Sequence, residues 1–254
     1  MTQAVANWIK RRASAPAGLY LAEAAGLDWL RVPGGAAIVD VIEVTADSIT
    51  LAKVVTAAPT RAAARAFGEG LALTHDAGAA GFGAGPDGYS GPSFIADLPM
   101  PTEPGATWGA FYANQRVLHY ARLAASQLGV AGCRLMDALA ERLADGDFDD
   151  DAPAARLHGD LWSGNVLYDA AGAVLIDPSA HGGHRITDLA MLSLFGAPYL
   201  DTVLDAYEQA SAYLPTGWRE LIGLHQVYPL LVHTVLFSGS YAGAAISAAR
   251  KYIR

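Results

Sequence analysis

The chain has 254 residues, a formal net charge of −8 and a hydrophobic content of 52%. The length allows one large domain or two small ones around a substantial core. The acidic balance, with no basic stripe to offset it, excludes a general nucleic-acid binder. The single cysteine, Cys133, excludes an intrachain disulfide and a thiolate metal cluster.

The high hydrophobic content does not indicate a membrane protein. The apolar excess is largely Ala and Leu interrupted by Arg, Asp and Glu, and no run of about 18 uninterrupted apolar residues occurs. The opening residues, MTQAVANWIKRR, carry their positive charges after a short apolar piece, which is the wrong order for a secretory signal. We therefore expect a cytoplasmic protein that acts on small molecules, with neither a membrane nor a nucleic acid as partner.

The first predicted elements are a strand, a helix and a hairpin. Lys10 follows an apolar pair at the end of the strand, where a lysine is most often solvated. Gly18 to Leu30 places apolar residues at helical spacing and carries Glu23. Two β-branched runs, Ala36 to Val44 and Ser48 to Val55, predict a hairpin that leads into the next part of the chain.

A helix and a glycine-rich loop come next. Thr60 is a typical N-cap for a helix that runs to His75, and His75 itself is expected to cap the helix or to contact solvent. Gly81 to Gly91 contains a GxGxxG match, but it follows a helix rather than a strand and Pro86-Asp87 interrupts it. These features argue against a dinucleotide-binding turn.

Most of the remaining chain is predicted to be helical. Thr107 to Leu128 forms a long amphipathic pattern, and Cys133 to Leu143 forms another. The acidic run Asp145 to Asp151 is expected to be a solvated loop, because it lacks the ligand spacing of a calcium site. Tyr199 to Arg254 predicts further helices with breaks at Leu214-Pro215 and at Pro229.

The central stretch, Leu157 to Ser179, carries the chemistry. It predicts a short strand, a polar loop bearing Asp160 and Asn165, and a hairpin of two apolar strands that ends at Asp177-Pro178. The hairpin strands are Val166 to Tyr168 and Val174 to Ile176. The hairpin therefore returns a second carboxylate to the edge that holds the first.

Taken singly, these polar residues have ordinary explanations. Asp160 and Asn165 are common turn residues, and Asp177-Pro178 is a common strand end. Together they match an arrangement for phosphoryl transfer, in which the first Asp takes the proton of the attacking hydroxyl while the Asn and the second Asp hold magnesium on the nucleotide phosphates. Oxygen ligands of this kind suit magnesium.

The same block resembles a known family in detail. Its motifs are HGDLWSGN at His158 to Asn165, Asp177-Pro178, Gly183-His184-Arg185 and Asp188-Leu189-Ala190, with further similarity in WGAFYANQR from Trp108 and FSGSYAGA from Phe237. They resemble the fructosamine kinase (ketosamine 3-kinase) family of the aminoglycoside-phosphotransferase and protein-kinase-like group. The Trp after HGDL, and the GH after the DP motif, are typical of the fructosamine branch.

The resemblance implies a two-lobed α+β protein-kinase-like fold, with ATP and Mg²⁺ as cofactors. A shortened, β-rich N-terminal lobe over residues 1–55 would face the nucleotide, and a mainly helical lobe over residues 56–254 would hold the catalytic loop and the acceptor. The implied substrate is a small sugar-amine, phosphorylated on the 3-hydroxyl of a ketosamine.

The resemblance also assigns roles to individual residues. Asp160 would be the base, Asn165 and Asp177 the magnesium ligands, and Lys10 the phosphate-binding lysine, positioned by Glu23. Four further residues are candidate substrate contacts: Trp162, His184, Arg116 and Tyr241.

One departure from the pattern lies upstream of Lys10. Kinase-like folds place a glycine-bearing hairpin before the lysine strand, and such a hairpin needs about 15 to 25 residues. Only nine residues precede Lys10. The small lobe could be short, the reading frame could start late, or a partner subunit could provide the cover. Two rival functions follow: a kinase for another small hydroxylated amine, such as an aminoglycoside, and a pseudokinase that acts through protein contacts.

Overall fold

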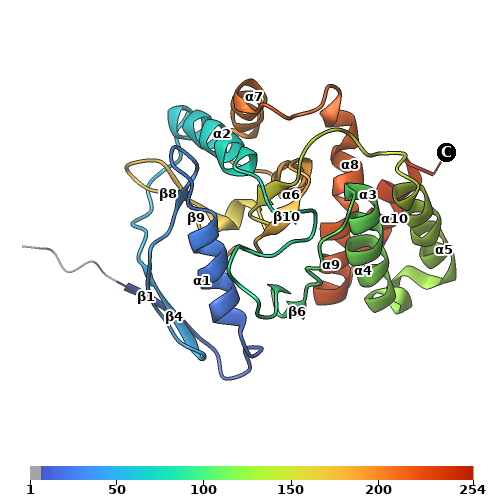
Figure 1. Cartoon of the computed structure of the whole chain (residues 1–254), viewed down its shortest axis with the longest axis horizontal. Coiled ribbons are helices and arrows are strands. Elements are labelled where there is room, and N and C mark those ends of the chain that lie inside the picture. The colour runs from blue at the N-terminus through green and yellow to red at the C-terminus, as the bar shows by residue number, and fades with distance from the viewer. Residues whose placement is uncertain (1–6, 254) are drawn as a thin grey trace, which may run out of the picture.

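The computed structural model describes residues 7–253, which form a small sheet-bearing part and a larger helical part (Figure 1). In the small part, strands β1 (Asn7–Arg11), β4 (Ser48–Ala52) and β3 (Val41–Val44) form an antiparallel sheet in that order. Helix α1 (Leu19–Trp29) packs against it. Alternation along β4 turns Ile49 and Leu51 into the core.

The strand predicted for residues 36–44 is in fact two strands. β2 (Ala37–Ile38) pairs in parallel with β9 (Ala173–Leu175), and β9 pairs with β8 (Val166–Tyr168). The chain changes sheets between β2 and β3, because the Val39 N–H donates to β9 while the Asp40 carbonyl accepts from β4. This crossing joins the small sheet to the hairpin of the central block.

Helix α2 (Arg61–Asp76) begins where the sequence predicts. The Thr60 hydroxyl accepts a hydrogen bond of 3.1 Å from the Ala63 N–H, which caps the helix. α2 packs closely on α7 (Leu200–Ala210), and a Cβ at Gly68 would collide with the Val203 carbonyl of α7. The two helices lie side by side above the central block in Figure 1.

The long helix predicted from residue 107 ends earlier than expected. α3 (Trp108–Phe111), a π-helical segment (Tyr112–Leu118) and α4 (His119–Leu123) run continuously, and α5 (Ala125–Ala144) then follows. Non-helical dihedral angles at Ala124 and Gly129 cause the break. The φ of 66° at Gly129 is a conformation that glycine adopts without strain.

The C-terminal segments complete the helical part. They are α6 (Ile186–Phe195), the 3₁₀ turn Trp218–Leu221, α8 (Ile222–His225), α9 (Val227–Phe237) and α10 (Tyr241–Arg250). The predicted break at Leu214-Pro215 is confirmed, because this pair lies between α7 and the 3₁₀ turn. The break predicted at Pro229 falls at Gln226 instead, between α8 and α9, and Pro229 lies in the first turn of α9, where a backbone N–H would have no helical partner.

Four short strands lie near the site: β5 (Phe94–Ile95), β6 (Leu98–Pro99), β7 (Ala155–Leu157) and β10 (His181–Gly183). β7 leads into the polar loop of the central block and pairs with β10. Within residues 7–253, we find no helix with both the length and the apolar character needed to cross a membrane.

Candidate active site

A cleft of about 730 Å³ lies where β1 and α1 of the small part face the central block and α9. Residues far apart in the sequence meet there. Six of the predicted site residues line it: Lys10, Glu23, Asp160, Trp162, Asn165 and Asp177. The sequence-based expectation that the two carboxylates and the amide share one cleft is therefore confirmed.

Asp160 and Asn165 are joined directly. The Asn165 side-chain amide donates to the Asp160 carboxylate at 3.0 Å and to the Asp160 backbone carbonyl at 2.8 Å. Because Nδ2 makes these bonds, the planar amide directs its Oδ1 away from Asp160. The loop thus presents a fixed Asp160 carboxylate, with the Asn165 amide oxygen turned away from it.

The buried Asp188 side chain binds the backbone of the loop that carries Asp160. Its carboxylate accepts hydrogen bonds from the N–H groups of His158, at 2.7 Å, and Gly159, at 3.0 Å. The His158 Nε2 lies 2.9 Å from the Ile176 carbonyl and ties the loop to the hairpin. His158 is therefore a satisfied buried side chain, and Asp188 has a structural role in holding the loop.

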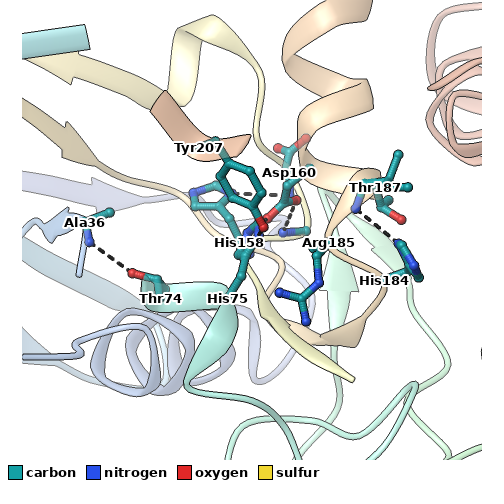
Figure 2. Close-up of polar contacts among 12 residues, drawn as sticks. Ala36, Thr74, His75, His158, Asp160, His184, Arg185, Thr187 and Tyr207 are labelled. Atoms are coloured by element: carbon teal, nitrogen blue, oxygen red, sulfur yellow. Dashed lines mark hydrogen bonds and ion pairs between the residues drawn. The ribbon is translucent and has the colours of Figure 1, made fainter. Parts of the chain in front are cut away.

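His75 lies behind Asp188, and the sequence-based interpretation of it is wrong. We expected a cap or a solvent contact, but its side chain is completely buried. Its Nε2 lies 3.1 Å from the Asp188 carboxylate and its Nδ1 lies 2.8 Å from the Tyr207 hydroxyl (Figure 2). Burial alone would raise the pKa of Asp188. The hydrogen bond and charge of His75, the charge of His158 and the hydrogen bond from the Gly159 N–H together have a larger effect, so the pKa of Asp188 is lowered.

Lys10 bridges two carboxylates across the cleft. Its ammonium lies 2.8 Å from both Glu23 oxygens and 2.8 Å from the Asp177 Oδ1. Burial lowers the pKa of Lys10, but the two carboxylates together raise it by more. The predicted Lys10–Glu23 pair is confirmed as a contact, and the structure adds Asp177 to it.

Asp177 has an unusual backbone. Its φ of 55° is in the left-handed region, which a non-glycine residue rarely occupies. This conformation costs about 1 kcal/mol. The left-handed conformation of Asp177 follows the end of β9, and the Asp177 carboxylate lies beside Lys10. Strain of this kind gathers at functional sites.

The pKa of Asp160 is raised to about 7. Burial is the main cause, and the nearby charges of Asp177 and Asp188 add to it, while the Asn165 hydrogen bond opposes them. A carboxyl group that titrates near neutral pH can accept a proton from a substrate hydroxyl under physiological conditions.

Three candidate substrate contacts, Arg116, His184 and Tyr241, are not among the described residues that line the cleft. The Arg116 guanidinium is buried, donates to the Pro101 carbonyl at 2.9 Å and lies over an aromatic ring. His184 pairs with Asp150 at 3.1 Å, so the acidic run is anchored rather than simply solvated.

One pair of cleft residues was missed at the sequence level. The Arg12 guanidinium forms a two-pronged ion pair with Asp97, which links the small part to the β5–β6 turn at the cleft. The partners are 85 residues apart. Neither lies in a recognisable motif, so only the tertiary structure brings them together.

The fold and cleft define a two-lobed protein-kinase-like protein. A choline kinase from Streptococcus pneumoniae, also solved in complex with AMP, shares this fold, with a TM-score of 0.58 over 97% of this chain and 85% of that chain at 16% identity. The chain belongs to the fructosamine kinase family, whose sequence model matches residues 3–254.

Two relatives illustrate the relationship. A proposed fructosamine-3-kinase from Thermobifida fusca has a solved structure that is 45% identical, with a TM-score of 0.87 over 96% of this chain and 84% of that chain. The ketosamine-3-kinase of Mus musculus is 30% identical over 154 residues, which is 60% of this chain. The match spans about half of that relative's length, 49%.

Proposed function

We propose that this protein transfers the γ-phosphoryl group of ATP to a hydroxyl of a small sugar-amine, specifically the 3-hydroxyl of a ketosamine. The observation that carries the proposal is the convergence of Asp160, Asn165, Asp177 and Lys10 on one cleft. Family membership supports the acceptor class, and the AMP complex of the structurally similar choline kinase supports a nucleotide as donor.

Asp160 is the proposed base. Its pKa of about 7 makes the carboxylate a stronger proton acceptor than an ordinary Asp, while a substantial fraction stays ionised near neutral pH. The hydrogen bond from Asn165 fixes one carboxylate oxygen, so the other is left to orient the incoming hydroxyl and accept its proton. Positioning of this kind supplies much of the rate enhancement in phosphoryl transfer.

The donor set fits magnesium and nucleotide phosphates. Asn165 Oδ1 and the Asp177 carboxylate are hard oxygen ligands, and few are needed because phosphates and water complete the coordination shell. When bound, magnesium would neutralise charge on the phosphates. Lys10 would bind the phosphates while Glu23 holds its position, and residues 1–55 would form the nucleotide-binding lobe.

Trp162 is the proposed wall of the sugar site. Its side chain is 41% exposed, lies over Gly164 and contacts the edge of Phe195, with 6.4 Å between ring centroids. A side chain at residue 164 would collide with the indole ring, which explains why glycine suits that position. The exposed aromatic face suits the C–H face of a sugar.

The proposal is tested by incubating the protein with Mg-ATP and a panel of ketoamines and aminoglycosides, followed by product analysis by phosphorus NMR. We expect a 3-phosphorylated ketoamine, and no product with Asp160→Asn. Phosphorylation of aminoglycosides alone would favour the rival kinase. Binding of Mg-ATP without turnover of any acceptor would favour a pseudokinase.

A further inference from the structure

A second, smaller pocket of about 220 Å³ branches from the cleft at the catalytic carboxylate. We call it the side pocket. Five residues line both spaces: Ala96, Asp160, Trp162, Leu236 and Phe237. A molecule whose hydroxyl sits at Asp160 can therefore extend a substituent directly into the side pocket.

The walls of the side pocket are mainly apolar. Ile95, Met191 and Val232 present buried hydrocarbon, and the Tyr228 hydroxyl is buried in a contact with the Met100 sulfur. Among the described residues around it, none is a lysine or an arginine, and Asp160 is the sole carboxylate. The guanidinium of Arg116 is separated from the pocket by the Tyr228 ring, 5.3 Å from the ring centroid. An anionic group in this pocket would therefore lose its hydration and face Asp160 with no described cation in direct contact.

His233 is the one histidine among the described residues that line the side pocket, beside the titratable Asp160 and Tyr228. Its Nδ1 lies 2.8 Å from the Pro229 carbonyl, which requires the proton to be on Nδ1. The ring packs between Phe195 and Tyr241, at centroid distances of 4.8 and 5.1 Å. Burial lowers the pKa of His233, which favours the uncharged form of this aromatic surface.

The geometry points to a substrate class. We infer that the side pocket binds the apolar substituent on the nitrogen of a ketoamine, so that ketoamines of alkyl or arylalkyl amines are preferred over those of α-amino acids. The inference rests on the proposed function. In a ketosamine the nitrogen is on C1 and the reacting hydroxyl on C3, so the substituent starts close to Asp160.

The size of the side pocket agrees with this occupant. Its volume corresponds to about seven water molecules at about 30 Å³ each. A benzyl or butyl group fits such a space. An α-amino acid would instead place a carboxylate one carbon from the nitrogen, among Met191, Val232 and the Asp160 carboxylate.

The test compares kcat/KM for N-benzyl, N-butyl and N-carboxymethyl derivatives of the same fructosamine. We expect the benzyl compound to exceed the carboxymethyl compound by about 10- to 100-fold, as burial of an apolar group of that size predicts. Equal values, or a preference for the carboxymethyl compound, would overturn the inference while leaving the proposed kinase intact. Failure to phosphorylate any ketoamine would overturn both.

Two variants locate the effect. Phe237→Ala removes a side chain that is 65% exposed and lines the side pocket, so the fold should tolerate it. We expect the benzyl-to-carboxymethyl ratio to fall at least threefold in Phe237→Ala, and further in Leu236→Asp. Tyr213→Ala, which removes an exposed aromatic side chain outside the pocket, should keep the wild-type ratio. An unchanged ratio in a folded Phe237→Ala protein would exclude this pocket as the source of selectivity.

Discussion

His75 Nε2 lies 3.1 Å from the Asp188 carboxylate, and both side chains are buried. Asp188 in turn binds the two backbone N–H groups that precede Asp160. Figure 2 shows His75 and Tyr207 close to the loop that carries His158 and Asp160. A histidine from α2 thus supports the loop of the proposed base through one intermediate residue, Asp188.

His75→Ala is expected to lower kcat by about 10- to 100-fold, because a small displacement of the base is enough for such a loss. The KM for ATP should change little, since His75 does not line the cleft. His75→Gln, which can still donate to Asp188, should recover part of kcat, and Tyr207→Phe should have a smaller effect. Steady-state kinetics measures all three, and a wild-type kcat in His75→Ala would refute the positioning role.

The activity should depend on pH through Asp160. Since its pKa is about 7 and the proposed base must be ionised, kcat/KM should be half-maximal near pH 7 and reach a plateau about one pH unit higher. Measurements at constant ionic strength between pH 5.5 and 8.5 would show the rise as a single ionisation. A flat profile would argue against Asp160 as the base.

The free energy of unfolding should fall, rather than rise, as the pH increases and Asp160 ionises. Its folded-state pKa is raised from 3.8 to about 7, so folding favours the neutral form. The stability it provides is fully present below about pH 4 and is lost as the pH rises through 7. Asp160→Asn should therefore stabilise the protein relative to wild type at pH 8, by at most about 4 kcal/mol, and by less at pH 5. Urea unfolding at both pH values measures this difference, which should be absent if Asp160 is well solvated.

Mg-ATP should raise the melting temperature of the wild-type protein, because a ligand that binds only the folded state stabilises it by about 2.7 kcal/mol at 100 times its Kd. Lys10→Met should lose most of this rise, since it leaves Glu23 and Asp177 without their shared cation. Lys53→Met, at an exposed lysine beyond β4, is the matched control. Equal melting shifts in the two variants would contradict a phosphate-binding role for Lys10.

Two glycines test the packing of the helices. A Cβ at Gly68 of α2 would collide with the Val203 carbonyl of α7, so Gly68→Ala should destabilise the protein by about 1–3 kcal/mol. A Cβ at Gly243 of α10 meets open space, and Gly243→Ala should stabilise the protein by about 0.5–1 kcal/mol. Urea unfolding compares them, and equal effects would mean that α2 and α7 pack less closely than described.

The sequence by itself determined the local chemistry. The hairpin at residues 166–176, the Thr60 cap and the roles proposed for Asp160, Asn165 and Asp177 all depend on neighbouring residues, so spacing and turn chemistry were enough to predict them. The Lys10–Glu23 pair followed from the family resemblance.

Only the tertiary structure decided which distant side chains meet. The Arg12–Asp97 pair, the contact of His75 with Asp188 and the burial of Arg116 depend on how separate elements pack, and no local pattern encodes such contacts. The side pocket has the same origin, because its apolar side chains read as ordinary core residues until α6, α9 and the β5–β6 turn leave a space beside Asp160. Patterns over a few residues determine turns and local elements. Tertiary packing determines which surfaces are buried against each other and which remain as pockets.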